Sequence, residues 1–174
     1  QYIWEMTKIV LAERRLATVR ALAPRVGGTS NAIGDAKTAF EANAPDIPFS
    51  AIFVGGELVA STGSPSDFSE VAAGVLASGE AHYTETMAAL PLRRAGSDEI
   101  RGVIVFGISA QLSFDDTYRT FFDTAARELA SNLAFEQENR EKELLNQELQ
   151  RRAEMLTELD RAKTAFFSNV SHEF

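Results

Sequence analysis

Cysteine is absent from this 174-residue chain, and histidine occurs only twice, as His82 and His172. Without thiols the chain can form no disulfide, hold no cysteine-ligated zinc or iron–sulfur centre and perform no thiol chemistry. Two histidines are also too few for a polyhistidine metal site. No apolar run approaches the roughly 18 residues of a membrane-spanning helix, and Glu5 and Lys8 come too early for a signal peptide. We therefore expect a cytoplasmic protein, or a cytoplasmic part of a longer one.

Positive charge is scarce as well. The chain has 17 Lys and Arg residues against 25 Asp and Glu residues, which gives a net charge of −8. Because such an anion is repelled by phosphate backbones and anionic lipids, we expect it to bind neither nucleic acid nor a membrane surface. The length fits about one domain of roughly 100–200 residues, and a hydrophobic content of 45% is ordinary for a globular protein.

Glycine and proline divide the first two thirds of the chain into short segments. The strongest strand pattern is 101–108, which is apolar on both faces and therefore predicts a central strand. Gly55 and Gly56 predict a tight turn between strands at 49–54 and 57–62. The other expected elements are helices at 9–22, 32–40 and 68–76 and strands at 81–86 and 88–93. Thr29, Ser30 and Asn31 offer N-caps for the second helix, and Ser64 to Asp67 open the third.

From about Thr117 onward the chain contains neither glycine nor proline, which predicts one very long helix or two in line. A first apolar series comprises Phe122, Ala126, Leu129 and Leu133. A second series, two residues out of register, has a positions at Phe135, Lys142, Leu149, Leu156, Lys163 and Val170 and d positions at Glu138, Leu145, Arg152, Leu159 and Phe166. We interpret the first as packing partly on the sheet and partly on a second copy, and the second as the seam of a parallel dimeric coiled coil.

Polar residues interrupt this second seam at Glu138, Lys142, Arg152 and Lys163. They are either ordinary imperfections of a coiled coil or the sign of a marginal seam that switches between two packings, as a signal conduit requires. The sequence leaves both interpretations open.

The last residues, Asp160 to Phe174, resemble the H-box that opens the dimerisation helix of sensor histidine kinases. In that family a phenylalanine lies six residues before the histidine, an asparagine three before, a serine directly before, and a glutamate and an apolar residue follow. This chain matches at Phe166, Asn169, Ser171, His172, Glu173 and Phe174. The family continues with Arg-Thr-Pro, and the given sequence ends before that point.

The resemblance implies a phosphoryl-transfer chemistry. A ring nitrogen of His172 would attack the γ-phosphate of ATP, and Glu173 would orient the ring and accept the proton of the other nitrogen. His172 takes position c of the second seam, on the solvent side, where a phosphoacceptor must be. The alternative is an ordinary surface histidine beside a glutamate.

The preceding region resembles a GAF domain, a small antiparallel sheet flanked by helices. The stretches that carry this likeness are 46–53 for the first strand, 102–108 for the last central strand, and 114–130 for the start of the closing helix. A PAS domain is the alternative, and it would lack the leading pair of helices. Glu5-Met6-Thr7 is similar to the exit segment of a PAS domain, which would imply a further sensor upstream, or belongs to an ordinary linker.

The sequence does not identify a ligand for this domain. The lack of cysteine excludes a covalently attached bilin. His82 would ligate a haem or line a pocket, or is a partly exposed strand histidine. Arg93 and Arg94 would bind an anion, or belong to a solvated edge strand. The pocket is equally compatible with no ligand at all.

We therefore expect an α+β, GAF-like fold followed by a long dimeric coiled-coil helix. The expected parts are a connector helix (1–22), a sensor domain (23–127), a signalling coiled coil (128–160) and the start of a phosphoacceptor helix (161–174). The resemblance implies the sensory and relay region of a two-component histidine kinase. Its partners would be a second copy, a response regulator and a separate ATP–Mg-binding kinase domain, without which the chain is inactive. The alternative is a non-enzymatic GAF–coiled-coil scaffold.

Overall fold

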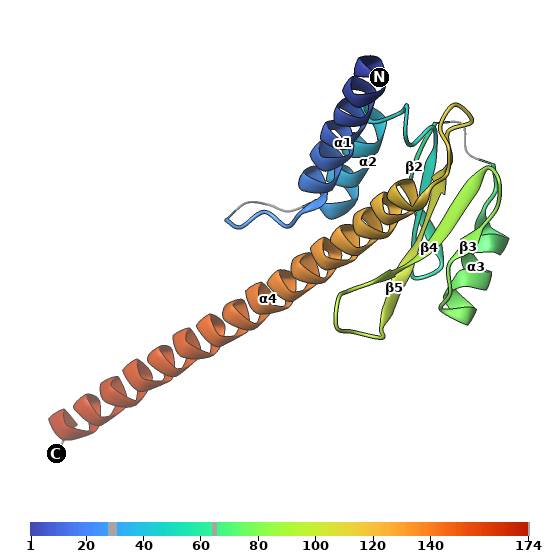
Figure 1. Ribbon diagram of the computed structural model, residues 1–174. Helices are drawn as coiled ribbons and strands as arrows, with labels where there is room; N and C mark the ends of the chain where they lie inside the picture. The colour runs from blue at the N-terminus through green and yellow to red at the C-terminus, as the bar shows by residue number, and fades with distance from the viewer. Residues whose placement is uncertain (28–30, 64–65, 174) are drawn as a thin grey trace. The chain divides into compact units, whose positions relative to one another are not determined.

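The computed structural model describes residues 1–27, 31–63 and 66–173 (Figure 1). Its elements in chain order are α1 (Tyr2–Leu22), α2 (Ala32–Ala42), β1 (Ser50–Val54), β2 (Glu57–Thr62), α3 (Ser69–Ser78), β3 (His82–Tyr83), β4 (Met87–Arg93), β5 (Ile100–Gly107) and α4 (Asp116–Glu173). The chain divides into two compact units, Gln1–Glu136 and Gln137–Phe174, and α4 contributes residues to both. In the described ranges no helix is long and apolar enough to cross a bilayer.

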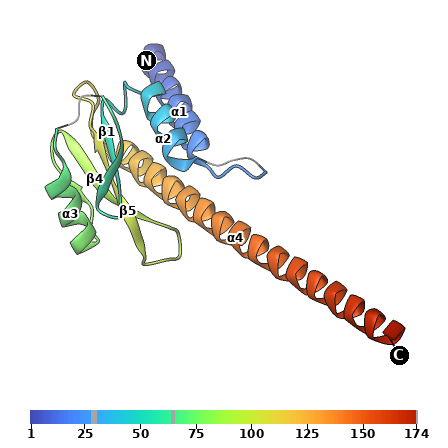
Figure 2. The same cartoon turned by 180° about the vertical axis from the view of Figure 1, so that it is seen from behind.

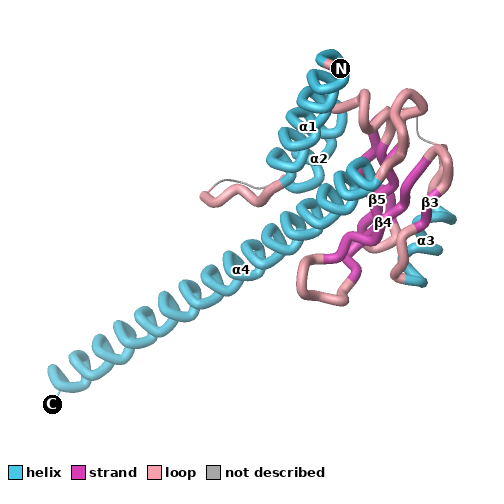
Figure 3. Tube along the Cα trace, viewed as in Figure 1, coloured by secondary structure: helices cyan, strands magenta, loops and turns pink. Residues whose placement is uncertain are grey.

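The five strands form one antiparallel sheet in the order β2-β1-β5-β4-β3 (Figure 3). The predicted central position of β5 is confirmed, because β1 pairs on one side of it and β4 on the other. The predicted hairpin is also confirmed: Gly55 and Gly56 connect β1 to β2 with φ angles of 61° and 84°, which a side chain would disfavour. Within β5, a Cβ atom on Gly102 would lie 2.0 Å from the carbonyl oxygen of Phe53, so only glycine allows the two strands to approach this closely.

The strand expected at 81–86 is shorter than predicted. Only His82 and Tyr83 pair with β4, and this two-residue strand is β3. The reason lies in Thr84, whose backbone N–H donates to the carbonyl oxygen of Met87 at 2.9 Å. The Thr84 hydroxyl oxygen accepts from the Thr86 and Met87 amides at 3.3 and 3.1 Å. These bonds close a tight turn and end the strand.

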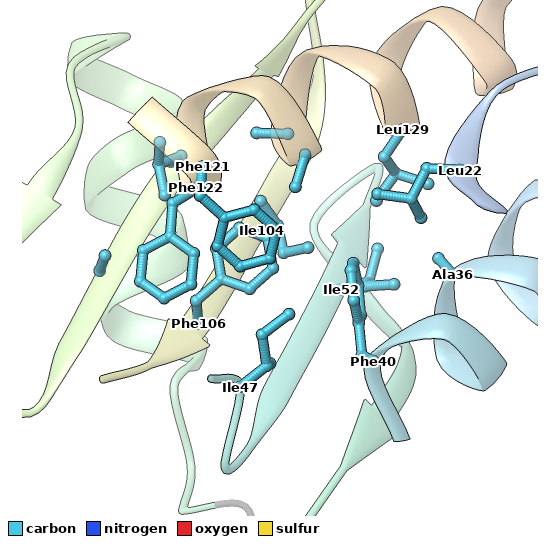
Figure 4. Packing of buried hydrophobic residues seen from close by; sticks show 14 of the residues in the cluster. Leu22, Ala36, Phe40, Ile47, Ile52, Ile104, Phe106, Phe121, Phe122 and Leu129 are labelled. Carbon is cyan, nitrogen blue, oxygen red and sulfur yellow. The ribbon is translucent and has the colours of Figure 1, made fainter. Parts of the chain in front are cut away.

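Helices cover both faces of the sheet (Figures 1 and 2). Because side chains alternate along a strand, Ile104 and Phe106 of β5 point to one face, while Val103 and Val105 point to the other. The first face packs against α1, α2 and the early turns of α4, where the Phe106 and Phe122 rings stack with their centroids 4.5 Å apart (Figure 4). The second face packs against the shorter helix α3.

The early turns of α4 carry the first apolar series. Phe122, Ala126 and Leu129 are buried in the core beneath the sheet, and Leu133 packs against them. Their packing on the sheet unit is therefore confirmed. Asp115 precedes the helix, and its carboxylate accepts the Tyr118 amide at 2.8 Å, which caps the helix start.

Two helix ends follow the sequence rules. Asn31 is the N-cap of α2, and its side-chain oxygen accepts the Gly34 amide at 3.0 Å. The other two cap candidates, Thr29 and Ser30, lie outside the described residues, as do Gly28, Ser64, Pro65 and Phe174. Helix α3 ends at Gly79 with a φ of 73°, the left-handed conformation that glycine favours.

Candidate functional site

A buried carboxylate in the loop before β1 holds α1 in place. Asp46, in the loop between α2 and β1, is fully buried. It accepts two hydrogen bonds from the guanidinium of Arg14, from Nε at 3.2 Å and from Nη2 at 2.6 Å. The Nε atom of Arg15 lies 3.5 Å from Oδ2 of the same carboxylate, the oxygen that also accepts the Nε bond of Arg14. Burying both charges costs hydration free energy, so a buried ion pair is favourable only when its geometry is good. The position of α1 is therefore tied to Asp46.

Tyr118 joins this cluster to the first turns of α4. Its hydroxyl donates to the backbone carbonyl of Asp46 and accepts the Ser109 amide at 3.1 Å. The guanidinium of Arg15 lies 4.5 Å from the centroid of the Tyr118 ring, a cation–π distance. Burial raises the pKa of Tyr118 above the ordinary value, so the hydroxyl stays protonated and remains a donor. Arg14, Arg15, Asp46 and Tyr118, called the Asp46 cluster below, thus connect the N-terminal helix to the start of α4.

The predicted phosphoacceptor lies at the other end of α4. His172 and Glu173 occupy its last turn, and both side chains are exposed. Asn169 and Ser171 are also exposed on the same turns, whereas Val170 is partly buried. The sequence-predicted site residues are therefore adjacent, on a helix, and accessible to a second protein.

The second unit exposes the apolar residues of the second heptad series. Leu145, Leu149, Leu156, Leu159 and Phe166 have between 54% and 67% of their surface exposed. Such a run of large apolar side chains on one helix is unusual for a solvated surface. Two ion pairs lie on the same helix. Glu148 pairs with Arg151 and, at 3.0 Å, with Arg152. Arg152, one of the polar seam residues, thus has an ion-pair partner within its own helix.

The other singled-out residues have structural positions. His82 is exposed on the edge strand β3, which agrees with the alternative of a strand histidine at the surface. Arg93 donates from Nη2 to the carbonyl oxygen of Gly79 at 3.0 Å and so binds the C-terminal end of α3. Arg94 lines a hollow of about 500 Å³ in which Asp98 and Asp123 offset the nearby arginines. Among the described residues no group of three or more His, Asp or Glu side chains is arranged to hold a metal ion.

Among the described residues, one cavity on the α3 face of the sheet is small. The cavity between α3 and β5 measures about 70 Å³, far below the roughly 300–1,000 Å³ of small-molecule sites. Part of this face is filled by Phe49 and Phe68, whose rings stack with centroids 5.4 Å apart. A larger, open hollow of about 470 Å³ lies along α1, where Met6 and Val10 face Pro45 and Leu112.

Sequence reasoning missed the Asp46 cluster. The sequence patterns place Asp46 only at the end of the second helix and in the segment 46–53 that resembles the first GAF strand, and they give Arg14, Arg15 and Tyr118 no role. One signal was available: a single carboxylate between Pro45 and the apolar pair Ile47–Pro48 is unusual unless a cation accompanies it into the interior.

Comparison with known proteins gives a structural match only. No described protein family and no curated protein matches this chain. Among solved structures, the GAF domain from Acinetobacter phosphoenolpyruvate-protein phosphotransferase is similar to it, with a TM-score of 0.54 and 15% sequence identity, over 72% of this chain and 93% of that domain. A second structure, described as a GAF domain, matches with a TM-score of 0.43 and 18% identity, over 72% and 88% of the two chains. The first match, together with the α1–α2 pair that a PAS domain would lack, shows that this protein has a GAF-like fold.

Proposed function

We propose that this chain is the sensory and relay region of a two-component histidine kinase. The observation that carries the proposal is the pairing of two features on one helix. Tyr118, near the start of α4, belongs to the buried Asp46 cluster of a GAF-like unit. His172, with its H-box neighbours, is exposed in the last turn. A change at the cluster is thereby connected, through one helix, to the phosphoacceptor.

The relay acts as a parallel homodimer. The exposed apolar side chains of Leu145, Leu149, Leu156 and Leu159 support this, because burying them requires a second helix. The polar seam positions make the dimer marginal, so two packings of similar free energy remain accessible. A ligand or an upstream domain shifts the population between them and moves His172 relative to the kinase domain.

At the phosphoacceptor, a bond forms between a ring nitrogen of His172 and the γ-phosphorus of ATP, and the bond to the leaving ADP oxygen breaks. Glu173 accepts the proton of the other ring nitrogen. The ATP–Mg complex is held by a kinase domain outside this chain, and a response regulator then accepts the phosphoryl group. We propose a cytoplasmic location, since ATP is available there.

The test uses the protein encoded by the complete reading frame, incubated with radiolabelled ATP and magnesium. We expect acid-labile phosphate on the protein and none in the His172→Gln variant. His82→Gln is the matched control, because the chain has only these two histidines. Glu173→Gln should lower the rate by about 100-fold, the usual contribution of a general base. If His172→Gln is labelled like the unaltered protein, or no label enters either, the chain is a GAF–coiled-coil scaffold instead.

A further inference from the structure

The open hollow along α1 has the size of a small-molecule site. It measures about 470 Å³ and lies within the compact unit 1–136. Ile3, Met6 and Val10 line it from α1, Pro45 from the loop before β1 and Leu112 from the loop before α4. In both views these two loops lie at the end of the sheet nearest the N-terminus (Figures 1 and 2). Its volume is within the roughly 300–1,000 Å³ of small-molecule sites.

The apolar lining ends at a positive charge. Among the described residues that line the hollow, Arg14 is charged and none is acidic. Arg14 follows Ile3 by three turns of the helix, a distance of about 16 Å along its axis. The hollow therefore has an elongated apolar part with a guanidinium at one end, which suits a ligand with an apolar tail and an anionic head.

The Asp46 cluster carries more positive than negative charge. Arg14 and Arg15 share the single carboxylate of Asp46, so one positive charge is in excess. The Nε atom of Arg15 is buried and makes no hydrogen bond. Because a partly buried charge without a counter-charge is unfavourable, a second anion beside these arginines would stabilise the cluster.

Arg14 is able to bind such an anion while it keeps Asp46. A guanidinium has five N–H donors, and the two bonds to Asp46 use only two of them. Its side chain is 29% exposed, whereas Asp46 is fully buried and so is shielded from the hollow. Ser109 also lines the hollow, and its hydroxyl oxygen accepts the Gln111 amide at 3.3 Å. The hydroxyl proton of Ser109 is therefore free to be donated to a bound anion.

We propose that this hollow binds an amphiphile with a carboxylate head and an unbranched apolar tail, the chemistry of a medium-chain fatty acid. The carboxylate accepts hydrogen bonds from Arg14, and the tail lies along Val10 and Met6 toward Ile3. This site goes beyond the proposed function, which names no class of ligand. It uses residues of the unit 1–136 alone and is independent of His172.

Calorimetric titration of the full chain with decanoate, below its micelle-forming concentration, tests the proposal. We expect one saturable site per chain. Each methylene group buried in an apolar site contributes about two- to fourfold in affinity, so octanoate should bind about 4- to 16-fold more weakly. Decanol has the same tail without the charge and should bind at least about tenfold more weakly than decanoate, because it cannot form a charge-assisted pair with Arg14.

A matched pair of variants at Val10 locates the site. Val10 is 50% exposed and lies one helical turn before Arg14, so a carboxylate placed there pairs with Arg14 and occupies the position of the ligand head. Val10→Glu should weaken decanoate binding at least about tenfold relative to Val10→Gln, which has nearly the same size and no charge. The two variants should bind decanol equally. Circular dichroism checks that both variants fold.

The other outcomes each overturn the proposal. Absence of a saturable decanoate site would show that the hollow takes no such ligand. Equal affinities for decanoate and decanol would show that Arg14 does not select a carboxylate. Equal decanoate binding by Val10→Glu and Val10→Gln would place the site elsewhere. None of these results bears on the labelling of His172, so the proposed kinase function stands or fails separately.

Discussion

Replacing Asp46 by asparagine removes the negative charge that binds the two arginines of α1. The side chain keeps almost the same size and shape. In the native protein the carboxylate is fully buried and accepts both Arg14 bonds, at 3.2 and 2.6 Å. An asparagine amide keeps one acceptor oxygen and turns an NH₂ group toward a donor. It also leaves Arg14 and Arg15 without their counter-charge.

The magnitude follows from how far the arginines remain in water. Removing one partner of a fully buried pair costs about 3–5 kcal/mol. The Arg14 and Arg15 side chains are 29% and 12% exposed, so each retains some hydration once the carboxylate is gone. We therefore predict that Asp46→Asn lowers the free energy of unfolding of residues 1–136 by about 2–3 kcal/mol.

Urea unfolding followed by near-ultraviolet circular dichroism measures this effect. The three tyrosines and the single tryptophan all lie within residues 1–136, so their part of the signal reports that unit. With a slope of about 2 kcal/mol per molar urea, the midpoint should fall by about 1 M. Asp98→Asn, the same change at an exposed carboxylate, should shift it by less than about 0.3 M. Equal shifts in the two variants would refute the role of the Asp46 cluster in fixing α1.

Two further predictions concern the same unit. Because burial raises the folded-state pKa of Tyr118 above its usual value of 10.0, its contribution to stability is complete below about pH 10 and is lost as pH rises through the folded-state pKa. Tyr118→Phe should therefore flatten the fall of the urea midpoint between pH 9 and 11, whereas the exposed control Tyr2→Phe should not; identical slopes would contradict this. Gly102→Ala forces a Cβ atom against the Phe53 carbonyl and should lower the stability of the protein by about 3 kcal/mol in thermal unfolding. The control Gly74→Ala has open space around it in α3 and should raise the stability by about 0.5–1 kcal/mol. A neutral Gly102→Ala would show that the β1–β5 spacing is adjustable.

The elements predicted well from sequence are those specified locally. Strand β5 is apolar on both faces from Val103 to Phe106, and α4 has neither glycine nor proline, so neither depends on distant partners for its recognition. The resemblance to an H-box around His172 is also carried by contiguous residues, and its role stays a prediction. The early stop of β3 depends on Thr84 hydrogen-bonding within a turn, which a strand-like composition conceals.

The Asp46 cluster could not be predicted because its members are far apart in the chain. Arg14 and Asp46 are 32 residues apart, and Asp46 and Tyr118 are 72 apart. Hydropathy patterns indicate that a segment is buried, but they do not say which cation will meet a buried carboxylate. The small cavity on the α3 face has the same origin, since Phe49 and Phe68 meet only after the sheet has formed.

The proposed relay, in which the packing phase of α4 is transmitted to His172, is tested most directly by two deletions in the protein encoded by the complete reading frame. Removing residues 143–149 deletes one heptad and changes the phase of the helix by only about 20°. Removing residues 143–147 shortens the helix by a similar length but rotates its two ends by about 140°. We predict that the rate of phosphorylation of His172 stays within about twofold after the heptad deletion and changes by about tenfold or more after the five-residue deletion. Equal rates for the two deletions would show that helix phase does not carry the signal.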